Sequence, residues 1–158
     1  MRTKRYVSGV IRSTLALSAT FALVQSAQAT LGEKGDSFER DRQSLNAIRK
    51  QDAQKENYTI QEMNSGPNKV REYISTDGIY FAISWDGVRH PDLTPLLGKY
   101  SDDFKQAKET KKKEFGRRNQ FIQGSRVVVQ TWQRTRGVGG RAYDPDLIPK
   151  GVDIHEIK

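Results

Sequence analysis

Hydrophobic and polar residues alternate most regularly between positions 57 and 85 of the chain. Alternation with a period of two is typical of β-strands that bury one face and expose the other. Two turn signals interrupt it, Ser-Gly-Pro-Asn at 65–68 and Asp-Gly at 77–78. The pattern predicts a three-stranded antiparallel meander over 57–85, with strands at 57–63, 69–75 and 79–85.

The Asp-Gly turn sets the register of the second hairpin, because a two-residue type I′ turn fixes which residues face each other. The expected pairs are Val70 with Trp85, Glu72 with Ile83 and Ile74 with Phe81. The sheet face expected to be apolar contains Tyr58, Ile60, Val70, Ile74, Ile79, Phe81, Ile83 and Trp85.

Glu72 interrupts this apolar face in the middle strand. Pairing Met63 with Lys69 in the first hairpin places Ile60 opposite Glu72, so the carboxyl group is flanked by apolar side chains. A buried carboxylate must find a cation or take up a proton. Two interpretations follow: a structural ion pair or a bulge that turns Glu72 outward, or a functional carboxylate with a raised pKa.

Two helices are expected. Apolar residues spaced by three and four predict a long amphipathic helix over about 94–114, which begins at Thr94 as N-cap and packs on the apolar sheet face. A thinner stripe predicts an N-terminal helix over about 33–50 at the edge of the sheet, with Asp36 as N-cap and Glu39 three positions on. The residues of the long apolar stripe are Leu93, Leu96, Leu97, Tyr100, Phe104 and Ala107.

The rest of the chain returns to a strand pattern at 120–123 and 126–134. The glycine-rich run at 137–140 is interpreted as a hairpin turn before a short strand at 141–143, since no Gly-Lys-Ser/Thr follows to make a phosphate loop. We therefore expect an α+β fold with an antiparallel sheet of about four to six strands.

The first 29 residues have the pattern of a cleaved signal peptide. Four basic residues and no acidic one precede ten mostly apolar residues, and the small-residue motif Ala-Gln-Ala ends at Ala29. Cleavage after Ala29 leaves a single domain at 30–158 in the periplasm or outside the cell. No later segment is apolar enough to cross a membrane.

Charge is unevenly distributed along the chain. The full chain carries 27 Lys and Arg against 19 Asp and Glu, a net charge of +8. Positions 104–143 contain eleven of the basic residues and two acidic ones. This stretch is either a solvated helix end with its loop or a basic surface that binds an anionic envelope component, a lipid headgroup or a polysaccharide. Nucleic acid is an unlikely partner for an exported protein. The candidate anion-binding residues are Lys108, Lys111, Lys112, Lys113, Arg117 and Arg118.

Little in the sequence indicates catalysis. There is no Cys, which excludes disulfides and thiolate metal sites, and the two histidines, His90 and His155, are not at metal-ligand spacing. There is no Gly-x-Ser-x-Gly motif. We expect no cofactor, no metal and no catalytic residue; the alternative is a small periplasmic hydrolase or transferase that uses Glu72 with His90 or His155.

Several short motifs follow one another in the order found in a known family. They include Val-Arg-Glu-Tyr at 70–73, Pro-Asp-Leu at 91–93, Gly-Arg-Ala-Tyr at 140–143 and Pro-Lys-Gly-Val at 149–152. Through them the chain resembles the family called domain of unknown function 2844, which groups small exported proteobacterial proteins. The resemblance implies export and one small domain and carries no activity. The Lys-rich stretch at 108–118 departs from the family pattern.

The matched motifs contain both Glu72 and Arg141, two charged residues in apolar or small surroundings. We expect Arg141, or failing that Arg126, to form a buried ion pair with Glu72. The function expected from the sequence is that of an exported cell-envelope protein, a non-enzymatic binding or structural module with a basic surface at 104–143.

Overall fold

The computed structural model describes residues 31–35, 37–111 and 119–158. Its central element is an antiparallel eight-stranded sheet in the order β1-β3-β4-β5-β8-β7-β6, with β2 paired to β3 outside this path. The strands are β1 (Ile48–Arg49), β2 (Ala53–Gln54), β3 (Tyr58–Ser65), β4 (Asn68–Ser75), β5 (Tyr80–Gly87), β6 (Asn119–Gln123), β7 (Val128–Arg134) and β8 (Gly137–Tyr143).

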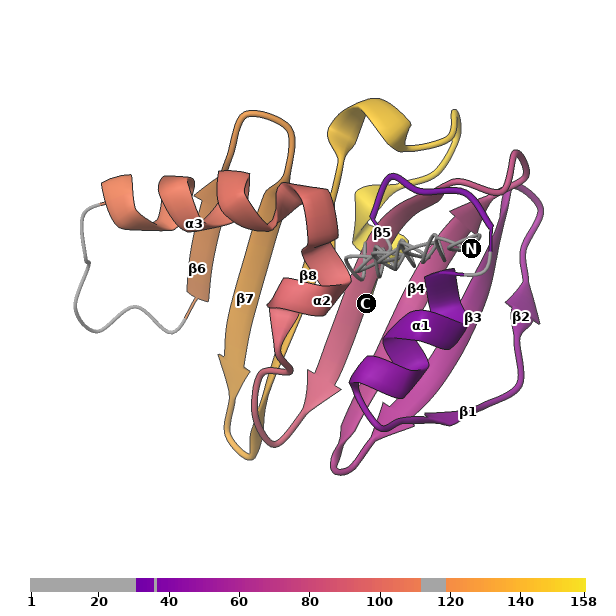
Figure 1. Ribbon diagram of the computed structural model, residues 1–158, viewed down its shortest axis with the longest axis horizontal. Helices are drawn as coiled ribbons and strands as arrows, with labels where there is room; N and C mark the ends of the chain where they lie inside the picture. Colours follow the sequence, from indigo (N-terminus) through magenta and orange to yellow (C-terminus); the bar gives the residue numbers. More distant parts are fainter. Residues whose placement is uncertain (1–30, 36, 112–118) are drawn as a thin grey trace, which may run out of the picture.

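The helices are α1 (Ser37–Ser44), α2 (Leu93–Leu97) and α3 (Ser101–Thr110), with the 3-10 helices η1 (Gly98–Tyr100), η2 (Pro145–Leu147) and η3 (Ile154–Glu156). Helices α1, α2 and α3 lie on one face of this sheet (Figure 1), and the C-terminal segment with the 3-10 helices η2 and η3 packs on the other. Figure 1 shows α1 in front of β3 and β4, and α3 in front of β6 and β7. None of the helices within the described residues is long and apolar enough to cross a membrane. The predicted signal peptide lies outside the described residues.

The predicted fold class, α+β with an antiparallel sheet built on a meander, is confirmed. The sheet has eight strands instead of four to six. Two of the additional strands, β1 and β2, are two residues long and pair with the outer edge of β3. Such short strands leave no periodic pattern in the sequence.

The register of the second hairpin is confirmed for Glu72 with Ile83, and likewise for Val70 with Trp85. A β-bulge after Tyr73 then shifts the pairing, so Ile74 lies opposite Tyr80 and not opposite Phe81. A bulge adds one residue to one strand, which a count from the turn cannot foresee.

The predicted register of the first hairpin is wrong by one residue. Met63 pairs with Val70, and Ile60 therefore pairs with Tyr73 instead of Glu72. The turn consists of Gly66, whose φ of 56° suits a glycine, and the residue that follows it. A shift of one residue moves every side chain of a strand to the other face.

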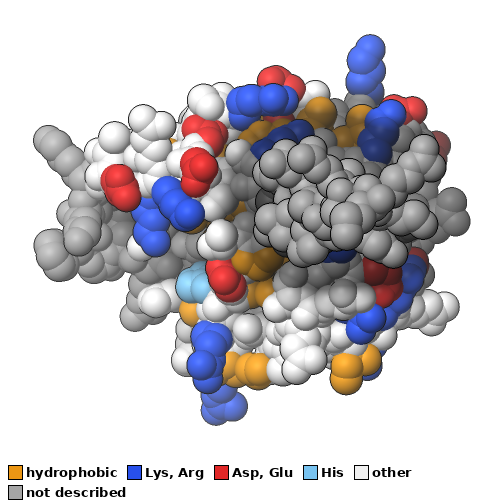
Figure 2. All heavy atoms as spheres, viewed as in Figure 1, with side chains coloured by type: hydrophobic (Ala, Val, Ile, Leu, Met, Phe, Trp, Pro, Cys, Tyr) orange, Lys and Arg blue, Asp and Glu red, His pale blue; other side chains and the backbone are white. Residues whose placement is uncertain are grey.

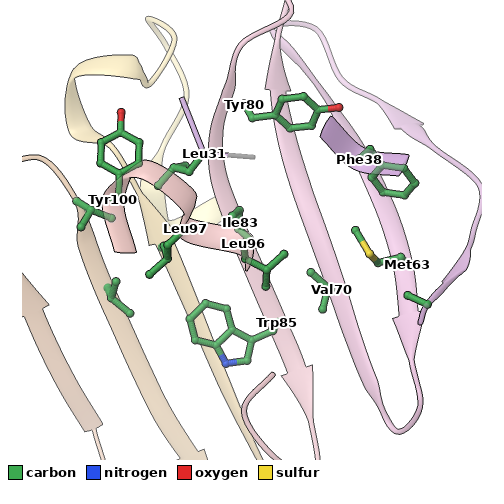
Figure 3. Packing of buried hydrophobic residues seen from close by; sticks show 14 of the residues in the cluster. Leu31, Phe38, Met63, Val70, Tyr80, Ile83, Trp85, Leu96, Leu97 and Tyr100 are labelled. Atoms are coloured by element: carbon green, nitrogen blue, oxygen red, sulfur yellow. The ribbon is translucent and has the colours of Figure 1, made fainter. Parts of the chain in front are cut away.

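The sheet consequently has two buried faces, where the sequence predicted a single apolar one. On the helix-covered face, Leu96 and Leu97 of α2 lie among Ile83, Val70 and Trp85 (Figure 3). On the other face, the C-terminal residues Leu147, Ile148, Val152, Ile154 and Ile157 pack against Tyr58, Tyr73, Phe81, Val128 and Tyr143. β5 is buried on both sides from Tyr80 to Trp85, which makes it the centre of the fold.

The predicted long helix is confirmed as a continuous helical segment from Leu93 to Thr110, in which one 3-10 turn, η1, separates α2 from α3. Helix α2 begins at Leu93, with Asp92 as the N-cap that accepts a hydrogen bond from the Thr94 amide, and Gly98 at a φ of 46° ends it. Helix α3 then runs to Thr110, and positions 112–114 of the prediction lie outside the described residues. A glycine at positive φ stops a helix at little cost.

The predicted N-terminal helix is much shorter than 33–50. It ends at Ser44, and Asn46 at a φ of 47° turns the chain into β1. It covers β3 and β4 and is not at the edge (Figure 1), with Phe38 buried beneath it. Asp36, the predicted N-cap, lies outside the described residues.

The glycine-rich run is a strand, not a turn. The chain turns at 135–136, and all four residues of the run pair with β7. A β-carbon on Gly139 would lie 2.3 Å from Nε1 of Trp132, and one on Gly140 would lie 2.2 Å from Cζ2 of Trp85. The glycines therefore make room for an indole ring on each face of β8.

Candidate functional site: a groove beside His90

A groove of about 610 Å³ lies between helices α2 and α3 on one side and the helix-covered face of strands β6 and β7 on the other. Its helical wall combines apolar side chains, those of Leu93, Leu97 and Phe104, with polar and charged ones of α2 and α3. Its floor is formed by Gln120 and Ile122 of β6 and by Thr131 and Gln133 of β7. The groove is thus of mixed polarity on the helical side and mostly polar on the strand side.

Strand alternation explains why these polar groups face the groove. Gln120 pairs with Thr131, and Ile122 pairs with Val129, which belongs to the core on the helix-covered face. Side chains two positions apart on a strand share a face. Gln120, Thr131 and Gln133 therefore occupy positions that carry core residues elsewhere in the same face.

His90 stands at one end of the groove in a defined orientation. The Trp85 indole Nε1–H donates to Nδ1 of His90 at 2.9 Å, and the two rings meet edge to face. Because Nδ1 accepts this bond, the proton of the neutral imidazole lies on Nε2. Burial, and next the charge of Lys108, lower the pKa of His90. The ring therefore offers an Nε2–H donor at neutral pH.

Two lysines of α3 line the groove, Lys105 and Lys108. Lys105 forms an exposed ion pair with Asp102 at 3.6 Å, which is weak enough for a ligand to displace. Lys108 lies over the Phe104 ring at 5.9 Å from its centroid. Acidic side chains are interspersed with the basic ones on this side of the molecule (Figure 2), so it is not a uniformly basic surface.

Asp103 ties α3 to the loop between β6 and β7. Its carboxylate accepts hydrogen bonds from the amides of Ser125 at 2.8 Å and Arg126 at 3.1 Å. Burial alone would raise the pKa of Asp103, but these donors outweigh it and lower the pKa. Gly124 allows the close approach, since a β-carbon there would lie 2.3 Å from Oδ2 of Asp103. The helical wall is therefore fixed to the sheet at this point.

The predicted ion pair of Glu72 does not form with either arginine. Arg141 donates to Oε1 of Gln130 at 2.7 Å, and Arg126 pairs with Asp144 at 3.3 Å. Arg141 precedes Ala142, the residue opposite Ile83 on the helix-covered face, so its side chain points to the other face. The register of β8 could not be predicted from the sequence, so this orientation of Arg141 could not be foreseen.

Asp144 is a buried acid that the sequence analysis missed. It is fully buried and accepts a hydrogen bond from the Tyr100 hydroxyl at 2.7 Å, in addition to its bond with Arg126. Burial, and next the hydrogen bond to Asp144, raise the pKa of Tyr100. The Asp-Pro sequence at 144–145 was the available signal, because Asp often caps a turn that begins with Pro.

The predicted anion-binding residues are only partly described. Lys108 lines the groove, and the Nζ atom of Lys111 donates to the carbonyl oxygen of Phe121. The other predicted residues, Lys112, Lys113, Arg117 and Arg118, lie outside the described residues.

The residues of the predicted catalytic alternative are apart. Glu72 is fully buried, and His155 belongs to η3 on the C-terminal segment, so neither lines the groove with His90. Within the described part of the chain, no group of three or more His, Asp or Glu side chains is placed to hold a metal ion.

A family model described as "Protein of unknown function (DUF2844)" matches residues 27–157. This agrees with the family that the sequence motifs indicate. No curated protein and no solved structure matches the chain.

Proposed function

Since the chain belongs to the DUF2844 family of proteins of unknown function, we propose its function from the groove beside His90. It is an exported, non-enzymatic protein of the cell envelope, and it binds an anionic polysaccharide in that groove. Export is supported by the basic, apolar and small-residue segments of the first 29 residues.

The observation that carries the binding proposal is the polar floor of the groove. Amide and hydroxyl groups of Gln120, Thr131 and Gln133 stand where the same sheet face elsewhere buries apolar side chains. Ligand sites combine an apolar lining with a few placed polar groups. Amides and hydroxyls that both donate and accept hydrogen bonds suit the hydroxyl groups of a sugar.

The cations at the rim select for a charged sugar. Lys105, Lys108 and the Nε2–H of His90 are donors, and an ammonium group has no acceptor capacity. Carboxylate groups spaced along a polymer would pair with the two lysines while its hydroxyls meet the floor. Asp92, which also lines the groove, already caps α2 through its bond to Thr94.

A polysaccharide fits this surface better than a lipid membrane does. Membrane adsorption favours clustered basic residues beside apolar ones that can insert. Here acidic side chains lie among the basic ones on this side of the molecule (Figure 2), and the site is a groove. A groove with hydrogen-bonding groups on one wall matches a chain of sugars more closely than a flat anionic surface.

Binding of alginate, a carboxylated polysaccharide, tests the proposal. We expect the protein to bind alginate, and the double variant Lys105→Ala/Lys108→Ala to bind at least about tenfold more weakly, because two charge-assisted contacts are lost. Isothermal titration calorimetry at two salt concentrations measures the affinity and its electrostatic part. Lys50→Ala/Lys55→Ala is the matched control, because both lysines are exposed near the opposite edge of the sheet.

Three results would contradict the proposal. The first is that alginate does not bind. The second is equal loss of affinity in the groove and control variants, which would place binding outside the groove. The third is binding to vesicles containing phosphatidylglycerol in place of alginate, which would make a membrane the partner.

A further inference from the structure

The carboxyl groups of Asp41 on α1 and Glu72 on β4 meet between that helix and the helix-covered face of the sheet. Asp41 is 2% exposed and Glu72 is 0% exposed, although the residues around them are apolar. Glu72 lies between Gln61 and Ile83 on the neighbouring strands. The two acids thus occupy one buried site, to which α1 and the sheet each contribute one.

Within the described residues, three of the four carboxyl oxygens have no hydrogen-bond donor. Oδ2 of Asp41 and both carboxyl oxygens of Glu72 are buried without a hydrogen-bond partner. Two ionised carboxylates cannot bond to each other, and two like charges at one buried site strongly disfavour double ionisation. A proton on one of them turns the same contact into a hydrogen bond between the two side chains.

Within the described part of the chain, no cation pairs with either carboxyl group in place of that proton. Arg40, next to Asp41, pairs with Glu33 at 3.3 Å, and the charge of Glu33 opposes the effect of Arg40 on the pKa of Asp41. On the sheet side, Gln61 is neutral and accepts a hydrogen bond from the Tyr80 hydroxyl at 3.0 Å. Helix α2, which contacts α1, carries no charged residue.

We propose that Asp41 and Glu72 share a proton, and that this shared proton is a pH-sensitive clasp that holds α1 on the sheet in acid and weakens as the pH rises. The clasp is distinct from the groove, and its test does not depend on any ligand.

The direction of the pKa shifts agrees with this proposal. Burial raises the pKa of Asp41 from 3.8 to about 7, against the opposing effects of its hydrogen bond with Glu72 and of Arg40. Burial, and then the charge of Asp41, raise the pKa of Glu72 well above its usual value. The folded state therefore holds more protons than the unfolded state above pH 3.8. The contribution to stability is fully present below that pH and is lost as the pH rises through about 7.

The test compares wild type with Asp41→Asn/Glu72→Gln, in which amides supply the missing donor without titrating. Urea unfolding between pH 4 and pH 9 gives the folding equilibrium constant of each. We expect the folding equilibrium constant of the variant, divided by that of wild type, to rise at least about tenfold between pH 5 and pH 8. The reason is that a pKa shift of one unit between the folded and unfolded states changes this constant tenfold. In the control Glu56→Gln/Glu109→Gln, two exposed carboxyls change and the ratio stays level.

The proposal is overturned if the folding equilibrium constants of wild type and the double variant change in parallel with pH. If the double variant does not fold, carboxyl ¹³C NMR of the wild type decides. Two side-chain carboxyls that titrate well above the usual range support the clasp, with Glu72→Gln removing one of them. Titration of every carboxyl in its usual range overturns it.

Discussion

The two ends of the helix-covered sheet face differ in the residues at their inward-facing strand positions, which are apolar at one end and polar at the other. Under α1 and α2, the inward positions of β3, β4 and β5 carry Met63, Val70 and Trp85, all fully buried. Beside α3, the inward positions of β6 and β7 carry Gln120 and Thr131, which line the groove. Polar residues at inward positions leave the space under a helix open to solvent, so the outer end gains a groove and contributes less to the core.

The two tryptophans extend this comparison to both faces of the sheet, with the largest expected effect. Trp85 of the central strand β5 is fully buried on the helix-covered face, whereas Trp132 of β7 is half-buried on the opposite face. We expect Trp85→Ala to lower the free energy of unfolding by about 3–5 kcal/mol. Trp132→Ala should cost about 1 kcal/mol, because much of its ring already contacts water. Urea unfolding of both variants measures the difference, and equal losses would contradict the contrast between the central strand β5 and the outer strand β7.

The neighbouring glycines of β8 test the same contrast more finely. Gly140→Ala places a β-carbon against the immobile Trp85 ring and 2.8 Å from the Gln130 carbonyl oxygen, and it should cost about 1–3 kcal/mol. In Gly139→Ala the β-carbon meets only the Trp132 side chain, which can shift toward solvent. We expect that change to cost less than about 1 kcal/mol, partly because alanine restricts the unfolded chain.

Thermal unfolding monitored by circular dichroism compares the two alanine variants under one condition. A larger loss for Gly139→Ala than for Gly140→Ala would mean that Trp132 is held as firmly as Trp85. The outer strand β7 would then be packed as tightly as the central strand β5.

The meander and the amphipathic spacing before α3 could be predicted because local patterns determine them. The pairing of Glu72 with Ile83 followed directly from a two-residue Asp-Gly turn. The other hairpin was missed by one residue, and the bulge after Tyr73 was not foreseen, since neither leaves a mark in the hydrophobic pattern. The second buried face became visible only once the C-terminal segment was in place.

The candidate site was predictable only in part. Lys108 and His90 were singled out from charge and residue type, and both line the groove. Gln120, Thr131 and Gln133 were not, because a polar residue in a strand normally indicates the solvent face. Glu72 was correctly identified as an anomaly, but its neighbour Asp41 lies on a helix that was predicted at the edge of the sheet and not over β4. Both the groove and the pair of Asp41 and Glu72 depend on contacts between segments that are far apart in the sequence.

The most direct test of the groove as the binding site is an amide NMR titration with a short alginate oligomer. We expect the largest chemical-shift changes at Gln120, Thr131 and Gln133, with a shift of the His90 ring resonances and little change along β3 and β4. Saturable binding that instead moves the amides of β1 to β3, and leaves β7 and His90 unchanged, would contradict the assignment of the groove.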